Sequence, residues 1–241
     1  MDVNKAFRYV FEDKQGLSKL LIGVLISLLS FLILPAFILQ GYLVKIIRHV
    51  MGGNDNDLPE WTDWGKLLVD GLAVAIGQFI WTLPFFLVFI IGTIATTGLG
   101  SMAEGGSDAA AAGAMGGGLL LACLGLLFAV AFLFMTPALM IQYAMKDEFS
   151  AMFRFSEVFD IIRNHTADIL IAFLVTLVAG MAIGLLGLLM MVTIILIPVV
   201  MLLAFAVNPY IQYATGHLYG QIARKISGGK AAVYDQGSNL V

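Results

Sequence analysis

Histidine and cysteine side chains can ligate a metal, and cysteine can also act as a nucleophile. His49, His165 and His217 lie in three separate segments with no His-x-x-x-His spacing, and the single Cys123 lies inside an apolar run. We therefore expect interfacial or solvated histidines rather than metal ligands, no disulfide framework and no bound cofactor. A nucleotide site is not expected either, because no glycine-rich phosphate loop follows a strand pattern.

Carboxylates could move protons or hydrolyse a substrate inside a membrane. Asp70 and Asp168 each come just before a long apolar run, where a carboxylate is stabilised by the helix dipole, so we expect both to cap helices. The centres of the apolar runs carry only neutral polar groups such as Gln78 and Thr176. Proton pumps and intramembrane hydrolases need titratable or nucleophilic groups at depth, so we expect neither, and no enzyme.

Three glutamines, Gln40, Gln142 and Gln212, occupy equivalent places in a weak internal pattern. Each follows a proline by three to five residues and precedes a tyrosine, as in Pro137-Ala138-Leu139-Met140-Ile141-Gln142-Tyr143. If the pattern is a true repeat, these side chains converge in one polar cluster. Chance similarity between apolar segments is an equal alternative, and hydrogen bonding between helices is the favoured role over ligand binding.

The composition requires elements that sit in a lipid solvent. The chain is 60% hydrophobic and 12% charged, against roughly 25% charged in soluble domains. Four stretches without any charge, 20–44, 71–103, 109–145 and 169–223, each exceed the ~20 residues of a spanning helix. The basic residues are few and scattered, which excludes a nucleic-acid partner and leaves membrane lipids as the expected one.

The N-terminal part combines an amphipathic segment with an interrupted apolar run. Residues 3–12 predict an interfacial helix, because apolar side chains recur on one of its faces. Residues 20–44 contain Pro35 near their centre, where a helix bends or stops. We favour a re-entrant helical hairpin here, because a full span would place Arg48 and the N-terminal basic residues on opposite sides. The single full span stays open.

The segment after this hairpin is rich in tryptophan and charge. Residues 58–68 predict a Trp-rich helix lying flat at the interface, with Trp61 and Trp64 on its apolar face. Pro59 is tolerated in the first turn, and Asp63 is on the polar face. We take Pro59, Trp61, Asp63, Trp64 and the preceding Arg48 as candidates for contact with a protein partner at the cytoplasmic surface.

The remaining chain predicts four transmembrane helices at 71–97, 119–145, 169–190 and 195–219. A Gly/Ala-rich external loop at 98–118 and a cytoplasmic interfacial helix at 149–164 connect them. The fold class is therefore all-α integral membrane: one domain over 1–226, with the hairpin, the four spans, cytoplasmic interfacial helices, both termini cytoplasmic and a mobile tail at 227–241.

The Trp-rich segment also resembles a known family. The motif Leu58-Pro59-Glu60-Trp61-Thr62-Asp63-Trp64-Gly65-Lys66-Leu67 is similar to the signature of the prokaryotic membrane family catalogued as domain of unknown function 4013, except that Thr62 stands where an acidic residue is expected. Gly41-Tyr42-Leu43, Arg48 and Asp70-Gly71-Leu72 share the resemblance. It implies a multi-pass protein of a bacterial or archaeal cell membrane and no particular activity.

Two functions follow as hypotheses. The first is a non-enzymatic membrane protein that organises lipid, or docks a partner, through its interfacial helices and hairpin. The alternative is a small transporter or channel for an unknown solute. The pair Gly180 and Gly184 permits close helix contact within one protomer or in a homo-oligomer.

Overall fold

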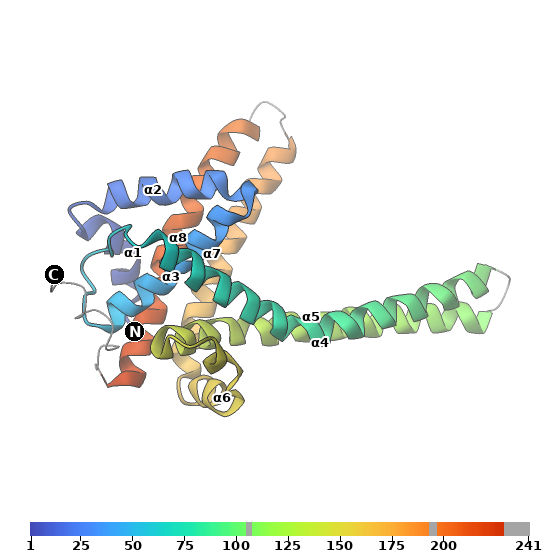
Figure 1. Cartoon of the computed structure of the whole chain (residues 1–241). Coiled ribbons are helices and arrows are strands. Elements are labelled where there is room, and N and C mark those ends of the chain that lie inside the picture. Colours follow the sequence, from blue (N-terminus) through green and yellow to red (C-terminus); the bar gives the residue numbers. More distant parts are fainter. Residues whose placement is uncertain (105–107, 193–196, 229–241) are drawn as a thin grey trace.

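The computed structural model describes residues 1–104, 108–192 and 197–228, and within these ranges every regular element is a helix. In Figure 1, α4 and α5 run side by side as a long arm that leaves the rest of the molecule, whereas α7 and α8 form a second pair. The elements are α1 (Val3–Glu12), α2 (Gly16–Leu28), η1 (Leu29–Leu32), α3 (Leu34–Met51), α4 (Trp64–Glu104), α5 (Asp108–Lys146), η2 (Phe149–Phe153), α6 (Phe155–Asn164), α7 (Thr166–Val192) and α8 (Ile197–Ser227).

Among the described residues, three helices are long and apolar enough to cross a membrane: Trp64–Met102 in α4, Asp108–Lys146 in α5 and Thr166–Leu185 in α7. At most 17% of the residues in their most apolar windows are buried by protein, which suits surfaces that face a hydrocarbon solvent. The predicted spans 71–97, 119–145 and 169–190 fall on these helices. The predicted fourth span, 195–219, falls mostly on α8, which is not among the three, and its first two residues lie outside the described ranges.

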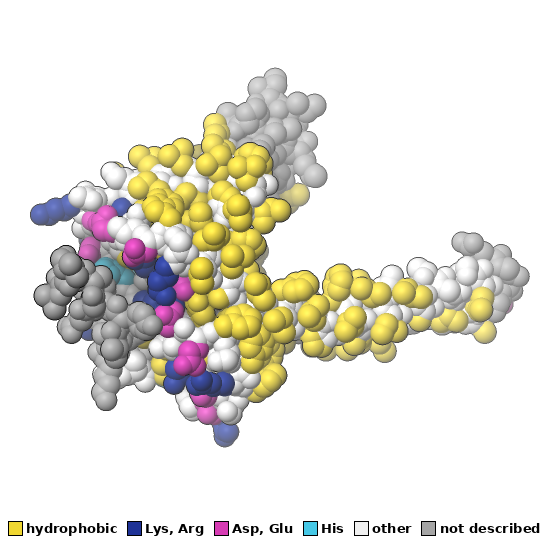
Figure 2. Space-filling view, viewed as in Figure 1, with side chains coloured by type: hydrophobic (Ala, Val, Ile, Leu, Met, Phe, Trp, Pro, Cys, Tyr) yellow, Lys and Arg dark blue, Asp and Glu magenta, His cyan; other side chains and the backbone are white. Residues whose placement is uncertain are grey.

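The charged and the apolar surfaces are separated in space. Figure 2 shows acidic and basic side chains gathered at one end of the body, whereas hydrophobic side chains cover the opposite side and the arm. Within the arm, Phe85 of α4 stacks on Phe128 of α5 with ring centroids 4.0 Å apart. This separation is typical of a protein that meets water at one end and lipid along its sides.

The predicted loop at 98–118 is wrong for the described part of that range. Helix α4 continues to Glu104, and α5 begins again at Asp108 and runs through Gly116, Gly117 and Gly118. Each glycine destabilises an exposed helix by about 1 kcal/mol, but the neighbouring alanines favour the helix, and backbone groups away from water must bond within it. The helices of the arm are therefore longer than the ~20 residues that a bilayer requires.

The apolar run at 20–44 does form a helical hairpin, composed of α2, η1 and α3. The chain reverses at Ile33, whose φ is +69°, two residues before Pro35. The Ile33 N–H donates to Ser30 O at 3.0 Å, and Pro35 sits in the first turn of α3, where its missing N–H costs nothing. The tip is apolar and exposed, with Phe31 76% exposed.

Helix α3 is the centre of the packing. One of its faces joins Tyr42, Ile46 and Val50 to one apolar cluster, and the adjacent face joins a second cluster. It crosses α4 at Gly41, where an added Cβ would lie 1.8 Å from the carbonyl oxygen of Leu67. The two backbones therefore touch, and no larger residue fits at this crossing without displacing one helix.

Two predicted interfacial helices differ in the structure. Residues 58–63 of the predicted Trp-rich helix 58–68 are not helical, and α4 begins only at Trp64. The predicted helix 149–164 is divided into η2 and α6, with Arg154 between them, because Arg154 has a non-helical backbone with φ −80° and ψ 80°. The α1 helix covers the predicted range 3–12. Most of the predicted mobile tail, 227–241, lies outside the described residues.

Candidate functional site

The segment between α3 and α4, residues 52–63, is fastened to the helices through its backbone, and we call it the clamped loop. Side chains of α1, α2 and α3 donate hydrogen bonds to four successive carbonyl oxygens. The pairs are Tyr9 Oη with Asp57 O (2.5 Å), Lys19 Nζ with Leu58 O (2.6 Å), Tyr42 Oη with Pro59 O (2.8 Å) and Lys45 Nζ with Glu60 O (2.8 Å). A segment without helix or strand thus has its main-chain acceptors satisfied by side chains.

Lys19 places a charge at the centre of this clamp, although its side chain is only 7% exposed. The ammonium lies 2.9 Å from Asp13 Oδ2 and 2.7 Å from Glu60 Oε1. Burial opposes the charged form, but the hydrogen bonds and charges of Glu60 and Asp13 outweigh it and raise the pKa of Lys19. Burial of Asp13 is likewise outweighed by hydrogen bonds from Gln15, Lys19 and Leu58, which lower the pKa of Asp13.

Glu60 connects the two ends of the hairpin. Lys19 lies in the first turns of α2 and reaches the carboxylate of Glu60, whereas Lys45 lies in the second half of α3 and reaches its backbone carbonyl. Lys45 also donates to the Thr62 hydroxyl at 2.7 Å. The chain therefore enters and leaves the hairpin at the same place on the molecule.

The candidate partner residues of the clamped loop do not share one face. Trp61 is 8% exposed, stacks on Tyr42 with ring centroids 3.7 Å apart, and donates its indole N–H to Lys19 O at 3.0 Å. Pro59 is buried as well. Trp64 is 47% exposed, and Asp63 is exposed beside it with φ +57°. The prediction of two tryptophans on one interfacial face is therefore wrong, since only Trp64 faces outward.

Arg48 belongs to a separate, interior network of charges. Its guanidinium donates to Asp70 on α4 and to Asp147 after α5, both at 2.5 Å, and Tyr143 Oη donates to Asp70 at 2.8 Å. Lys66 also donates to Asp147. Asp70 is 2% exposed and lies in the second turn of α4, so it is an ion-pair partner and not the helix cap that was predicted. This network joins α3, α4 and α5.

The three glutamines have separate surroundings. Gln142 is buried on α5 and donates to Glu157 on α6, and with nearby Lys146 and Arg154 this lowers the pKa of Glu157. Gln212 donates to Asn208, one turn earlier on its own helix, at 2.7 Å. Gln40 lies on α3. Hydrogen bonding between helices is thus observed for Gln142, whereas among the described residues no hydrogen bond joins the three glutamine side chains in one cluster.

The histidines also lie apart. His217 is fully buried and its ring packs on Tyr9 with centroids 4.5 Å apart, while His49 Nε2 lies 3.5 Å from Asp57 and His165 Nδ1 lies 3.9 Å from Asp168. Asp168 itself accepts hydrogen bonds from Lys225 at 2.8 Å. Among the residues that the structure describes, no group of three or more His, Cys, Asp or Glu side chains is placed to hold a metal ion.

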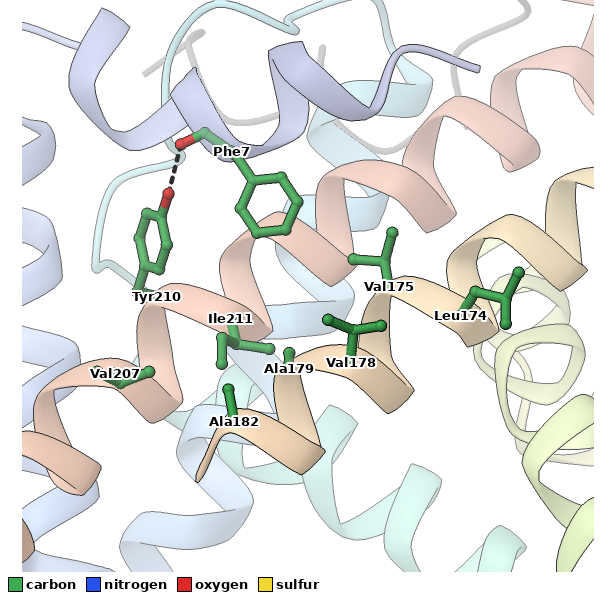
Figure 3. A pocket seen from close by; sticks show the side chains of 9 residues that line it. All are labelled: Phe7, Leu174, Val175, Val178, Ala179, Ala182, Val207, Tyr210 and Ile211. Atoms are coloured by element: carbon green, nitrogen blue, oxygen red, sulfur yellow. Dashed lines mark hydrogen bonds between the residues drawn. The ribbon is translucent and has the colours of Figure 1, made fainter. Parts of the chain in front are cut away.

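A groove with a volume of about 450 Å³ lies where α1, α7 and α8 meet, and we call it the α7–α8 groove. Figure 3 shows its side chains, of which all but one are purely hydrocarbon. The exception, Tyr210, turns its hydroxyl to Phe7 O at 2.8 Å. The lining residues are Phe7, Leu174, Val175, Val178, Ala179, Ala182, Val207, Tyr210 and Ile211. Such a wall suits an apolar ligand.

The donors of the clamp were not among the candidate residues that the sequence indicated. In the sequence, Tyr9 lies within the amphipathic segment 3–12, Lys19 directly precedes the apolar run 20–44, and Tyr42 lies within that run. A weak signal existed, because Lys19 and Asp13 are charges at the edge of an apolar run, where a buried ion pair needs both signs. Nothing in the spacing pointed to Leu58 or Pro59 as their acceptors.

Comparison with known proteins gives one family. The family model described as "Protein of unknown function (DUF4013)" matches residues 26–192, which include the clamped loop, α4, α5 and α6. The match begins after Tyr9 and Lys19, so two donors of the clamp precede it. No curated protein and no solved structure matches the chain.

Proposed function

Because the chain belongs to the DUF4013 family of proteins of unknown function, we propose a function from its own structure: it is a non-enzymatic integral membrane protein that organises the lipid of one leaflet. The hairpin of α2, η1 and α3 inserts as a wedge into that leaflet and returns to the same side. The observation that carries the proposal is the contact of both hairpin ends with Glu60.

The dimensions of the hairpin support a wedge. The 13 residues of α2 extend ~20 Å and the four of η1 add ~8 Å, while the 18 residues of α3 extend ~27 Å. Each arm is thus shorter than the ~30 Å hydrocarbon core. Since both ends meet at Glu60, an exposed apolar tip at Phe31 and Leu32 goes into the leaflet without reaching the other side.

A wedge displaces lipid on one side only, which favours curvature or a local lipid arrangement. The interfacial helices add to this on the same side. In α6, Val158 and Ile161 pack inward, while Phe155 and Phe159 stay more than half exposed, as an interfacial helix requires. The basic residues at the hairpin ends favour the cytoplasmic side of a bacterial or archaeal cell membrane, with both termini there.

Docking of a protein partner remains a secondary part of this proposal. The exposed Trp64, next to Asp63, offers an aromatic anchor at the water-facing end of α4. The buried Trp61 stacks on Trp64 with ring centroids 5.6 Å apart and so positions it, instead of contacting the partner.

The test is remodelling of vesicles by the purified protein. Large unilamellar vesicles that incorporate the wild type are expected to become smaller or tubular in electron micrographs, and a double variant of the tip, Phe31→Ser with Leu32→Ser, is expected to lose this effect. The matched control is Phe86→Ser with Leu87→Ser, two similarly exposed apolar residues on the arm.

Two results would contradict the proposal. One is a wild type that leaves the vesicles unchanged at every protein density. The other is a tip variant that is incorporated equally and remodels as the wild type does. A solute flux through the same vesicles that disappears in Gln142→Leu would instead favour the transporter hypothesis.

A further inference from the structure

The α7–α8 groove is formed by α1, α7 and α8 and is separate from the hairpin of α2, η1 and α3. We propose that it binds one acyl chain of an anionic phospholipid, whose phosphate group lies at Arg8.

The walls of the groove leave room for an acyl chain and present no polar group that would bond to a ligand. Ala179 and Ala182 follow each other by one turn on α7, and their small side chains leave space opposite Val207 and Ile211 of α8. Figure 3 shows both walls converging below Phe7. From Val175 to Ala182 the helix rises ~10 Å, and the volume of about 450 Å³ is within the ~300–1,000 Å³ of ligand sites.

At the upper end of the groove, where Figure 3 shows Phe7 and Tyr210, the polar atoms are already paired. The hydroxyl of Tyr210 donates to the backbone carbonyl of Phe7, and the Phe7 and Tyr210 rings lie 6.2 Å apart. A sugar, nucleotide or peptide would leave its own polar groups unpaired in this place, which costs free energy. The buried part of the ligand must therefore be hydrocarbon.

A cation stands beside this end. Arg8 follows Phe7 in α1 and is one turn before Phe11, so it borders the exposed apolar flank of the helix. Arg8 is 67% exposed, and its one described ion pair, with Glu12 at 3.5 Å, is an exposed pair of small energetic value. A phosphate can replace that partner with a bidentate contact.

The surroundings select a lipid over other amphiphiles. Val178 at the groove rim and Met181 one turn away are at least 60% exposed on a helix that is apolar enough to cross a membrane. The groove therefore opens toward hydrocarbon below and toward charge above. A molecule that is apolar at one end and anionic at the other, and that is present at high concentration there, is a phospholipid.

The experiment is native mass spectrometry of the full chain released from nanodiscs made of phosphatidylglycerol and phosphatidylcholine with identical acyl chains. The wild type is expected to retain one phosphatidylglycerol. Ala179→Leu fills the groove and is expected to reduce retention about tenfold. Gly180→Leu is the matched control, because a Cβ at Gly180 meets no atom within 4 Å and retention should not change.

The headgroup is tested independently. Arg8→Gln is expected to remove the preference for phosphatidylglycerol while keeping a bound lipid, whereas Lys14→Gln, an exposed lysine nearby, should keep the preference. If Ala179→Leu does not fold, Ala182→Leu tests the same space. Equal retention by the wild type and a folded groove variant overturns the proposal, as does a wild-type dimer that becomes monomeric in Ala179→Leu, since a second copy would then be the occupant.

Discussion

Replacing Lys19 by Met tests whether the clamped loop depends on one buried charge. Methionine keeps most of the length of the side chain but removes the ammonium that bonds Asp13, Glu60 and Leu58 O. Glu60 is 63% exposed at its side chain, so its share of the energy is small. Asp13 is only 8% exposed, and removing one partner of a buried pair costs about 3–5 kcal/mol.

We expect an effect near the lower end of that range, about 3 kcal/mol, because one of the two carboxylates is solvated. This corresponds to a ~10²-fold rise in the equilibrium for opening the loop. The Leu58 amide reports it directly, since its N–H donates to Asp13 Oδ2 at 3.1 Å. Hydrogen exchange of the protein in nanodiscs, followed by mass spectrometry, measures the loss of protection.

Two controls make the result specific. Lys14→Met removes an exposed lysine from the same connection and should change exchange by less than ~0.5 kcal/mol. Combining Lys19→Met with Asp13→Asn removes both charges, and the double variant should be more stable than the sum of the two single effects predicts. Unchanged protection at Leu58 in Lys19→Met, or an equal loss in Lys14→Met, would refute the clamp.

Three further predictions concern packing, acid and the interior charges. Gly41→Ala should destabilise the protein by about 1–3 kcal/mol in thermal unfolding, because its Cβ would meet the backbone of α4, whereas Gly180→Ala should be neutral or stabilising. Because the pKa of Asp13 is lowered, its contribution to the stability of the clamped loop is present above the ordinary value of 3.8 and is lost as the pH falls through the folded-state value. Hydrogen exchange of the clamped loop, corrected for intrinsic rates, should therefore rise below about pH 3.8. The rise should be smaller in Asp13→Asn. Arg48→Met should lower the free energy of unfolding by about 3–5 kcal/mol, because it leaves Asp70 buried without its cation, and adding Asp70→Asn should recover part of the loss in the same unfolding assay.

The helical fold and its break were predictable because they depend on local chemistry. Runs without charge give the helices that can cross a membrane, and Pro35 marks the bend to within two residues. The amphipathic period of residues 3–12 corresponds to α1. Such signals need only the neighbours along the chain, whereas the number of crossings and their direction stay predictions.

The clamp could not be predicted, because its partners are distant in the sequence. Trp61 carries the same local signal as Trp64, but Trp61 is buried against Tyr42, 19 positions away, and bonds to Lys19 O. Asp70 likewise looks like a cap until Arg48 and Tyr143 are placed beside it. Donors from two helices also help to explain why the start of the predicted helix 58–68 is not helical despite favourable periodicity. The carbonyl oxygens of Leu58, Pro59 and Glu60 accept hydrogen bonds from side chains instead of from amides four residues ahead.

Helix α4 is long and unbroken, so a small rotation near its N-terminus moves its other end by a large distance. Its pivot is the backbone contact between Gly41 and the first turns of α4, and from Gly71 to Glu104 it extends ~50 Å. A tilt of about 5° at the pivot therefore displaces the far end of the arm by ~4 Å.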